Sequence, residues 1–212
     1  MPVGAYISGG NVIQLLAKIM DAHINSIVRR IEAVSQEAEL CFGAFAADQL
    51  NWQPGPGQWS IGQCLEHLII SNKQYFPQLK ELASNTKQFS FWERLPGWPR
   101  LCGLIMLRYV TPVPRLRLSA PALFQPPHSA VNPEIVSIFK AHNQQLIKYM
   151  QAVRNLEYDR PRITSPVAPF IAYSLRDAFS LLANHEERHL LQAQQVLRQA
   201  GFPSGKQSLT KC

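Results

Sequence analysis

Residues 174–200, SLRDAFSLLANHEERHLLQAQQVLRQA, decide the fold, because they carry the complete signature of one long helix. Ser174 and Asp177 form the S-x-x-D pair that caps a helix start, and Gly201 follows the last residue. Between these ends, residues at helical spacing form one stripe: Ala178, Leu182, His185, His189 and Val196. The pattern predicts a helix that turns an apolar face, with two histidines in line, toward a protein core.

Three further stretches show the same apolar period. They are residues 21–47, residues 60–84 and residues 132–153. Ser60 and Gln63 form a capping box at the start of the second stretch, and Pro77 predicts a kink inside it. No convincing strand pattern accompanies these helices. The sequence therefore predicts an all-α protein, an antiparallel four-helix bundle.

A long connection separates the second helix from the third. Residues 87–130 are rich in proline, and a short helix is predicted within them over Leu101–Tyr109. Six of the chain's lysines and arginines lie in residues 87–127 against one acidic residue, Glu93. Residues 1–20 are interpreted as an extension, residues 21–202 as the bundle domain and residues 203–212 as a tail. A connection of this length within a compact domain is usually functional.

Composition narrows the classes of function. The chain has 212 residues, 46% of them hydrophobic, and a mean hydropathy of −0.10, as expected for a globular domain with a core. No apolar run approaches the ~20 residues of a membrane helix, and no signal peptide is recognised, so we expect a cytoplasmic protein without a membrane partner. Four widely spaced cysteines predict reduced thiols. The net charge of +7 favours an anionic partner, but nucleic acid is unlikely without a recognised binding motif.

The stretch at residues 185–189, HEERH, also matches the zinc-protease pattern H-E-x-x-H. The chain offers no His, Asp or Glu after His189 to complete such a site. Glu186 would lie about 100° around the helix from His185, and we expect it to be solvated, beside Glu187 and Arg188. The stretch is therefore interpreted as two histidine ligands on one helix face rather than a protease motif.

His67, on the inward stripe of the second helix, is the best candidate for a third ligand. Three imidazoles from two helices would leave one metal position open, as catalytic sites require. Zinc, nickel and iron all suit this donor set. Cys64 and His142 stay open as rival ligands or neighbours, and the further candidates for a pocket or second shell are Ser71, Tyr75 and Gln192.

Three short motifs, taken in order, resemble those of the DinB/YfiT-like superfamily. They are Trp59–Leu68 with the sequence WSIGQCLEHL, Leu118–Pro121 followed by Phe124, and Ser174–Asp177 followed by His185, His189 and Gln192. The resemblance spans roughly residues 21–201. It implies a four-helix bundle that binds a divalent metal through His67, His185 and His189. It also implies a homodimer, since many relatives are dimers. Gln63 departs from the glutamate that relatives often carry there.

The resemblance implies several activities. Characterised relatives include thiol S-transferases that use bacillithiol, mycothiol or glutathione. The leading hypothesis is a metal-dependent thiol S-transferase, in which the metal activates a low-molecular-weight thiol for attack on a small-molecule substrate. A metal-dependent hydrolase with metal-bound hydroxide is one alternative, and a non-catalytic metal-binding stress-response bundle is another. No catalytic residue beyond the three ligands is assigned.

Overall fold

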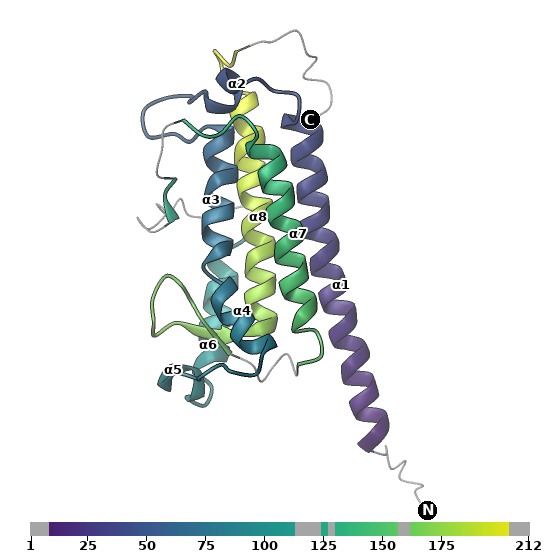
Figure 1. The fold of residues 1–212 in the computed structure, drawn as a ribbon. Helices are drawn as coiled ribbons and strands as arrows, with labels where there is room; N and C mark the ends of the chain where they lie inside the picture. The colour runs from purple at the N-terminus through teal and green to yellow at the C-terminus, as the bar shows by residue number, and fades with distance from the viewer. Residues whose placement is uncertain (1–8, 113–123, 127–129, 157–161, 204–212) are drawn as a thin grey trace, which may run out of the picture.

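The computed structural model describes residues 9–112, 124–126, 130–156 and 162–203, and its long helices form a four-helix bundle (Figure 1). The bundle consists of α1 (Gly9–Phe42), α3 (Ile61–Lys73) continued by α4 (Phe76–Ala83), α7 (Ile135–Ala152) and α8 (Leu175–Leu197). The all-α bundle predicted from the sequence is confirmed. Helices α1 and α8 run in one direction, whereas α3, α4 and α7 run in the other (Figure 1). Because α4 and α7 share a direction, the chain must travel back along the bundle between them.

Local sequence signals set the ends of these helices. Ser60 Oγ accepts a hydrogen bond from the Gln63 backbone N–H at 3.1 Å, and Gln63 Oε1 accepts one from the Ser60 N–H at 3.0 Å. Ser174 Oγ accepts from the Asp177 N–H at 3.1 Å. Both predicted caps are therefore formed. The helix expected over residues 60–84 breaks before Pro77, which lies in the first turn of α4, where a missing N–H costs nothing.

Some boundaries differ from the sequence expectation. Helix α1 begins at Gly9 rather than residue 21 and ends at Phe42, and a separate short helix, α2 (Ala47–Asn51), follows it. Two strands, β1 (Arg162–Thr164) and β2 (Ala172–Ser174), pair antiparallel with Ile163 opposite Tyr173. Three residues are too few to show a strand's alternating pattern, so the sequence did not predict this hairpin.

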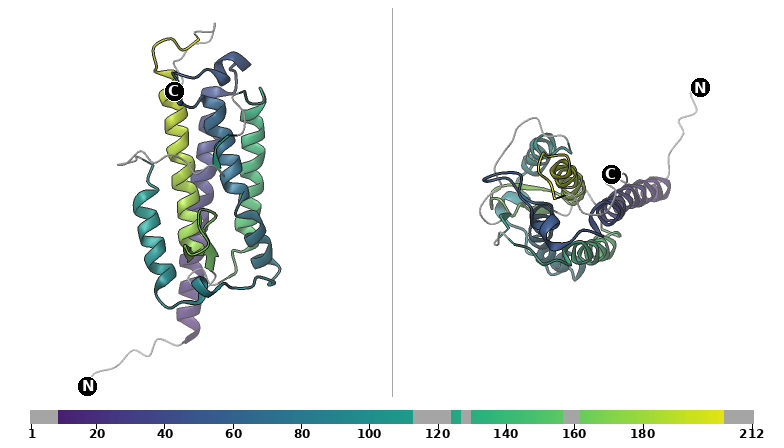
Figure 2. Two further views of the ribbon diagram at one scale, coloured as in Figure 1. Left: turned by 90° about the vertical axis from the view of Figure 1, so that its left-hand side faces the viewer. Right: turned by 90° about the horizontal axis from the view of Figure 1, so that it is seen from above.

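The returning connection contains α5 (Phe91–Arg94) and α6 (Trp98–Tyr109). Helix α6 stands beside the bundle, where it contacts α8 and β2 (Figure 2). The short helix predicted over Leu101–Tyr109 is thus present and begins three residues earlier. Arg115, Arg117 and the Leu118–Pro121 motif lie outside the described residues.

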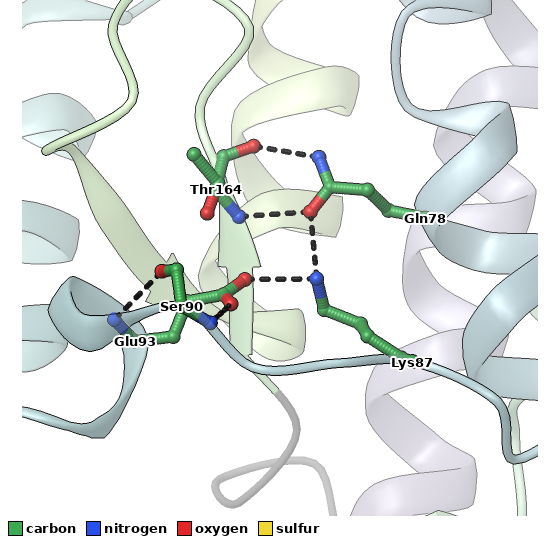
Figure 3. Close-up of polar contacts among 5 residues, drawn as sticks. All are labelled: Gln78, Lys87, Ser90, Glu93 and Thr164. Atoms are coloured by element: carbon green, nitrogen blue, oxygen red, sulfur yellow. Dashed lines mark hydrogen bonds and ion pairs between the residues drawn. The ribbon is translucent and has the colours of Figure 1, made fainter.

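A buried polar cluster fastens the start of this connection to α4 and the hairpin (Figure 3). Gln78 of α4 pairs with the backbone of Thr164 like a further strand, accepting from its N–H at 3.0 Å and donating to its carbonyl at 2.8 Å. Lys87 Nζ donates to Gln78 Oε1 at 3.1 Å and forms an ion pair with Glu93 Oε1 at 2.9 Å. Both charged side chains are almost fully buried. The cluster holds α4, α5 and β1 together.

Apolar side chains fill the bundle in two clusters, with polar side chains between them. Along α8, one cluster includes residues up to Ala183 and the other resumes at Leu190. The histidine stretch lies in this interval. The buried polar residues of the same level are Ser35, Asn72, His142, Asn143 and Glu186. The bundle therefore provides a polar layer at the height of the predicted metal site.

Candidate metal centre

The three predicted ligands meet between α3 and α8, which pack side by side. One ligand nitrogen from each of His67, His185 and His189 lies within 4.8 Å of the others. The Nε2 atoms of His67 and His185 are 3.1 Å apart. His67 and His189 are buried, and His185 is half-buried. In the described part of the chain, no carboxylate or thiol joins this cluster.

The ring of His67 is held by the backbone of the returning connection. Its Nδ1 lies 2.6 Å from the carbonyl oxygen of Phe124, so Nδ1 carries the proton and donates it. Nε2 is then the nitrogen with a free lone pair, which a metal ligand requires. Phe124 belongs to a sequence motif that assigns no role to it. Its backbone carbonyl now has one, which no side-chain pattern could reveal.

Trp59 covers two of the three imidazoles. Its ring centroid is 4.7 Å from that of His67 and 5.7 Å from that of His189, nearly parallel to the latter. It directly precedes Ser60, the cap of α3, so the capping box also sets the position of the tryptophan. Sequence reasoning placed Trp59 only as a motif residue and did not assign it to the site.

Burial keeps the three imidazoles neutral at neutral pH. It lowers the pKa of His67, and it lowers the pKa of His185 to about 3 together with the nearby His67 and Arg188. The pKa of His189 lies well below its ordinary value, chiefly because of burial and also because of the other two histidines and Arg188. Neutral imidazole is the form that coordinates metal, so protons do not compete for the site near pH 7.

These residues fit a divalent transition metal. Nitrogens about 2.0–2.1 Å from one tetrahedral ion are roughly 3.3 Å apart, close to the 3.1 Å between His67 and His185. The Nδ1 atom of His189 is buried and has no hydrogen-bond partner among the described residues. Burying a nitrogen without a partner costs free energy. A bound metal cation would give the nitrogens of this cluster a partner.

The other candidate residues take different positions. Gln192 follows His189 by three residues on α8, and its side chain partly opposes the lowering of the His189 pKa. Cys64 lies in the apolar core as a free thiol whose pKa is raised by burial. Tyr75 bonds the hydroxyl of Tyr173 at 2.6 Å, and His142 stacks on Phe76 with centroids 5.3 Å apart. Ser71 is buried, and its hydroxyl has no partner among the described residues.

Two expectations from the sequence are wrong. Glu186 is fully buried rather than solvated, and its carboxylate accepts hydrogen bonds from Asn72 at 2.8 Å and Asn143 at 2.9 Å. It belongs to the polar layer and is not part of the histidine cluster. Cys41 is not a free thiol but lies in a disulfide, whereas Cys64 and Cys102 are free.

The fold and the cluster define a class of protein: a four-helix bundle with a three-histidine metal-binding site. A family model described as the DinB superfamily matches residues 30–193, and the chain belongs to that superfamily. The solved structure of YfiT from Bacillus subtilis is similar over 96% of this chain and 95% of its own, with a TM-score of 0.54 and 12% identity. YfiT is described as a probable metal-dependent hydrolase with an unusual four-helix bundle topology. None of the curated proteins matches this chain.

Proposed function

We propose that this protein is a metal-dependent thiol S-transferase, which joins a low-molecular-weight thiol to a small electrophile. The observation that carries the proposal is the cluster of three neutral imidazoles. No carboxylate joins this cluster in the described part of the chain. A divalent metal held by these three imidazoles would keep its full charge and would lower the pKa of a bound thiol, so that a thiolate would be available near neutral pH.

The absence of a described general base favours a thiol over water as the nucleophile. A thiol with an ordinary pKa of about 8.5 needs less help to lose its proton than water does. Glu186 is the acidic residue next to His185 in the sequence, and its carboxylate is held by Asn72 and Asn143. It is therefore unsuited to take a proton from a nucleophile at the histidine cluster.

The residues around the cluster would orient the ligands and keep water out. The Phe124 carbonyl fixes the tautomer of His67. Trp59 shields His67 and His189 on one side. Arg188 places a positive charge near all three imidazoles, where it would stabilise a thiolate or an anionic substrate.

The test begins with metal content. Purified protein is expected to hold about one equivalent of zinc, nickel or iron by elemental analysis, and His67→Ala and His189→Ala are expected to lose it. His142→Ala is the matched control, because His142 is also a buried histidine but lies outside the cluster. Metal retained in both ligand variants would contradict the site.

The activity is then measured with glutathione, bacillithiol and mycothiol against haloalkane and haloarene electrophiles. In the expected reaction the thiolate sulfur forms a bond to carbon, and halide departs with the bonding electron pair. Conjugate should form with the metal-loaded protein and with His142→Ala, but not with His67→Ala. No conjugate above the uncatalysed rate with any thiol would overturn the transferase proposal.

Metal-dependent hydrolysis is the second candidate, because YfiT is described as a probable hydrolase. It uses the same histidines but needs no thiol. Hydrolysis of ester or amide substrates by thiol-free, metal-loaded protein, lost in His189→Ala, would favour it. A third outcome, metal binding with neither activity, would favour a bundle in which the metal only joins α3 to α8.

A further inference from the structure

Helix α6 exposes an apolar stripe on its outer side. Leu101, Leu104 and Ile105 are 49%, 62% and 46% exposed, and their spacing places them on one face. The inner face carries the buried residues Pro99, Cys102 and Gly103. Gly103 packs so close to Asp177 of α8 that a side chain there would collide with its carboxylate. The helix is thus fixed against the bundle with its aliphatic stripe turned outward.

Aromatic side chains continue this stripe toward α5 and the hairpin. Trp92 lies 5.3 Å from Phe91 and 5.7 Å from Trp98, measured between ring centroids. Trp98 Nε1 donates to the carbonyl oxygen of Phe170 at 2.8 Å. Phe91 and Phe170 are 69% and 50% exposed. The apolar surface is therefore continuous over three elements rather than a scatter of single residues, and a patch of this kind marks an interaction site.

The charge on this surface is positive. Arg100 and Arg108 are exposed at either end of the aliphatic stripe, and Arg94 is exposed on α5. Glu93 is the acidic residue of this part of the chain, and it is buried in its ion pair with Lys87. No described acidic side chain of α5 or α6 offsets the three arginines.

We propose that the α6 face, formed by Leu101, Leu104 and Ile105 with Arg100 and Arg108, binds the surface of an anionic phospholipid bilayer. Aliphatic and aromatic side chains would enter the boundary between headgroups and acyl chains, and the arginines would contact lipid phosphates. None of the described helices is long and apolar enough to cross a membrane. The expectation of no membrane partner rested on the lack of a spanning segment, which a helix lying on the surface does not need.

Charge and side-chain type favour this occupant over others. A second copy of the chain would bring like-charged arginines together, which costs free energy. Nucleic acid would be attracted by the arginines and could stack on the aromatic side chains, but the aliphatic stripe of Leu101, Leu104 and Ile105 would offer its bases neither stacking nor hydrogen bonds. An anionic bilayer complements both the charge and the aliphatic stripe.

The experiment is flotation of the full-length protein with phosphatidylglycerol–phosphatidylcholine vesicles and with phosphatidylcholine vesicles alone. Binding is expected to the anionic vesicles and to weaken with added salt. Leu104→Gln is expected to weaken it about tenfold or more, and Arg100→Gln about fivefold. The matched controls are Leu40→Gln, at a leucine 63% exposed on α1, and Arg29→Gln, at an exposed arginine of the same helix. Neither control should change binding.

Other outcomes would overturn the proposal. Equal binding to both kinds of vesicle, or equal losses in Leu40→Gln and Leu104→Gln, would show that the α6 face is not the lipid site. Absence of vesicle binding, combined with a dimer that Leu104→Gln converts to monomer in sedimentation, would assign the face to a second copy. Salt-dependent binding to single-stranded DNA without vesicle binding would assign it to nucleic acid. Metal content should match wild type in every variant, which separates this test from that of the histidine site.

Discussion

The side chain of Arg188 places a positive charge beside the candidate metal site. It follows His185 by three residues and directly precedes His189, and it lowers the pKa of all three imidazoles. Its guanidinium donates to the Tyr109 carbonyl oxygen at 3.4 Å, an acceptor without net charge. We expect Arg188→Gln to tighten metal binding by roughly three- to tenfold, because a repulsion between like charges disappears. Competition with a metal-sensitive dye measures the change.

Arg198→Gln is the control for this prediction. Arg198 is exposed at the end of the same helix, so its removal changes the net charge equally but leaves the surroundings of the cluster intact. Similar changes in both variants would indicate a general charge effect. Weaker metal binding in Arg188→Gln would show that the arginine supports the site through its position rather than its charge.

Glu186 should make the metal-free protein less stable as the pH rises. Burial raises its pKa from 4.5 to about 8, despite the hydrogen bonds from Asn72 and Asn143. Between these values the folded state binds one proton more than the unfolded state, so the free energy of unfolding falls by up to ~1.4 kcal/mol per pH unit. We expect Glu186→Gln to remove this slope. Urea unfolding of both proteins between pH 6.5 and 8 measures it.

The histidines do not obscure that comparison. Their lowered pKa values contribute stability that is present above the ordinary histidine pKa of 6.5 and is lost as the pH falls. Their effect therefore lies mainly below the chosen window and is common to both proteins. Parallel slopes for wild type and Glu186→Gln would contradict a raised pKa at Glu186.

At single positions, the sequence predicted the grouping of the three histidines better than the positions of their neighbours. His67, His185 and His189 lie on inward stripes, which a 3.6-residue period identifies. The prediction that Glu186 is solvated was wrong because only one face of α8 was expected to be buried. Helix α8 contacts α1, α3 and α6, so several of its faces are buried. The Phe124 carbonyl could not be predicted, because every residue carries one.

At the level of elements, the ion pair of Lys87 and Glu93 joins α5 to α4 and β1. We expect Glu93→Gln to destabilise the protein by about 3 kcal/mol or more, because it leaves a buried ammonium without its counter-charge. The double variant Lys87→Met/Glu93→Gln should be more stable than Glu93→Gln alone, because no uncompensated charge remains. Urea unfolding followed by circular dichroism measures both. A double variant less stable than the single one would contradict this reasoning.

Element boundaries were predictable where a side chain terminates the helix. Ser60 and Ser174 cap their helices as their sequences indicate, and Pro77 marks the break between α3 and α4. The hairpin was not predictable, because its strands are three residues long and its edge is completed by Gln78 from another element. Tertiary contacts, rather than local pattern, form this piece of sheet.

For the whole molecule, the metal should act as a cross-link between α3 and α8. A ligand that binds only the folded state stabilises it by about 2.7 kcal/mol at a concentration 100 times its dissociation constant. We therefore expect a chelator to lower the melting temperature of wild type and to leave His189→Ala unchanged. Differential scanning calorimetry measures the difference. A chelator effect of equal size in His189→Ala would place the metal elsewhere.

The bond from His67 to the Phe124 carbonyl has a consequence for the connection between α6 and α7. Since this connection supplies the acceptor that orients a ligand, metal affinity and the position of Phe124 belong to one thermodynamic cycle. If metal binding favours the observed position of Phe124 by a given factor, then holding Phe124 in that position must raise the metal affinity by the same factor. An effector that engages this connection, far along the chain from His185 and His189, would therefore tune the metal site without touching it.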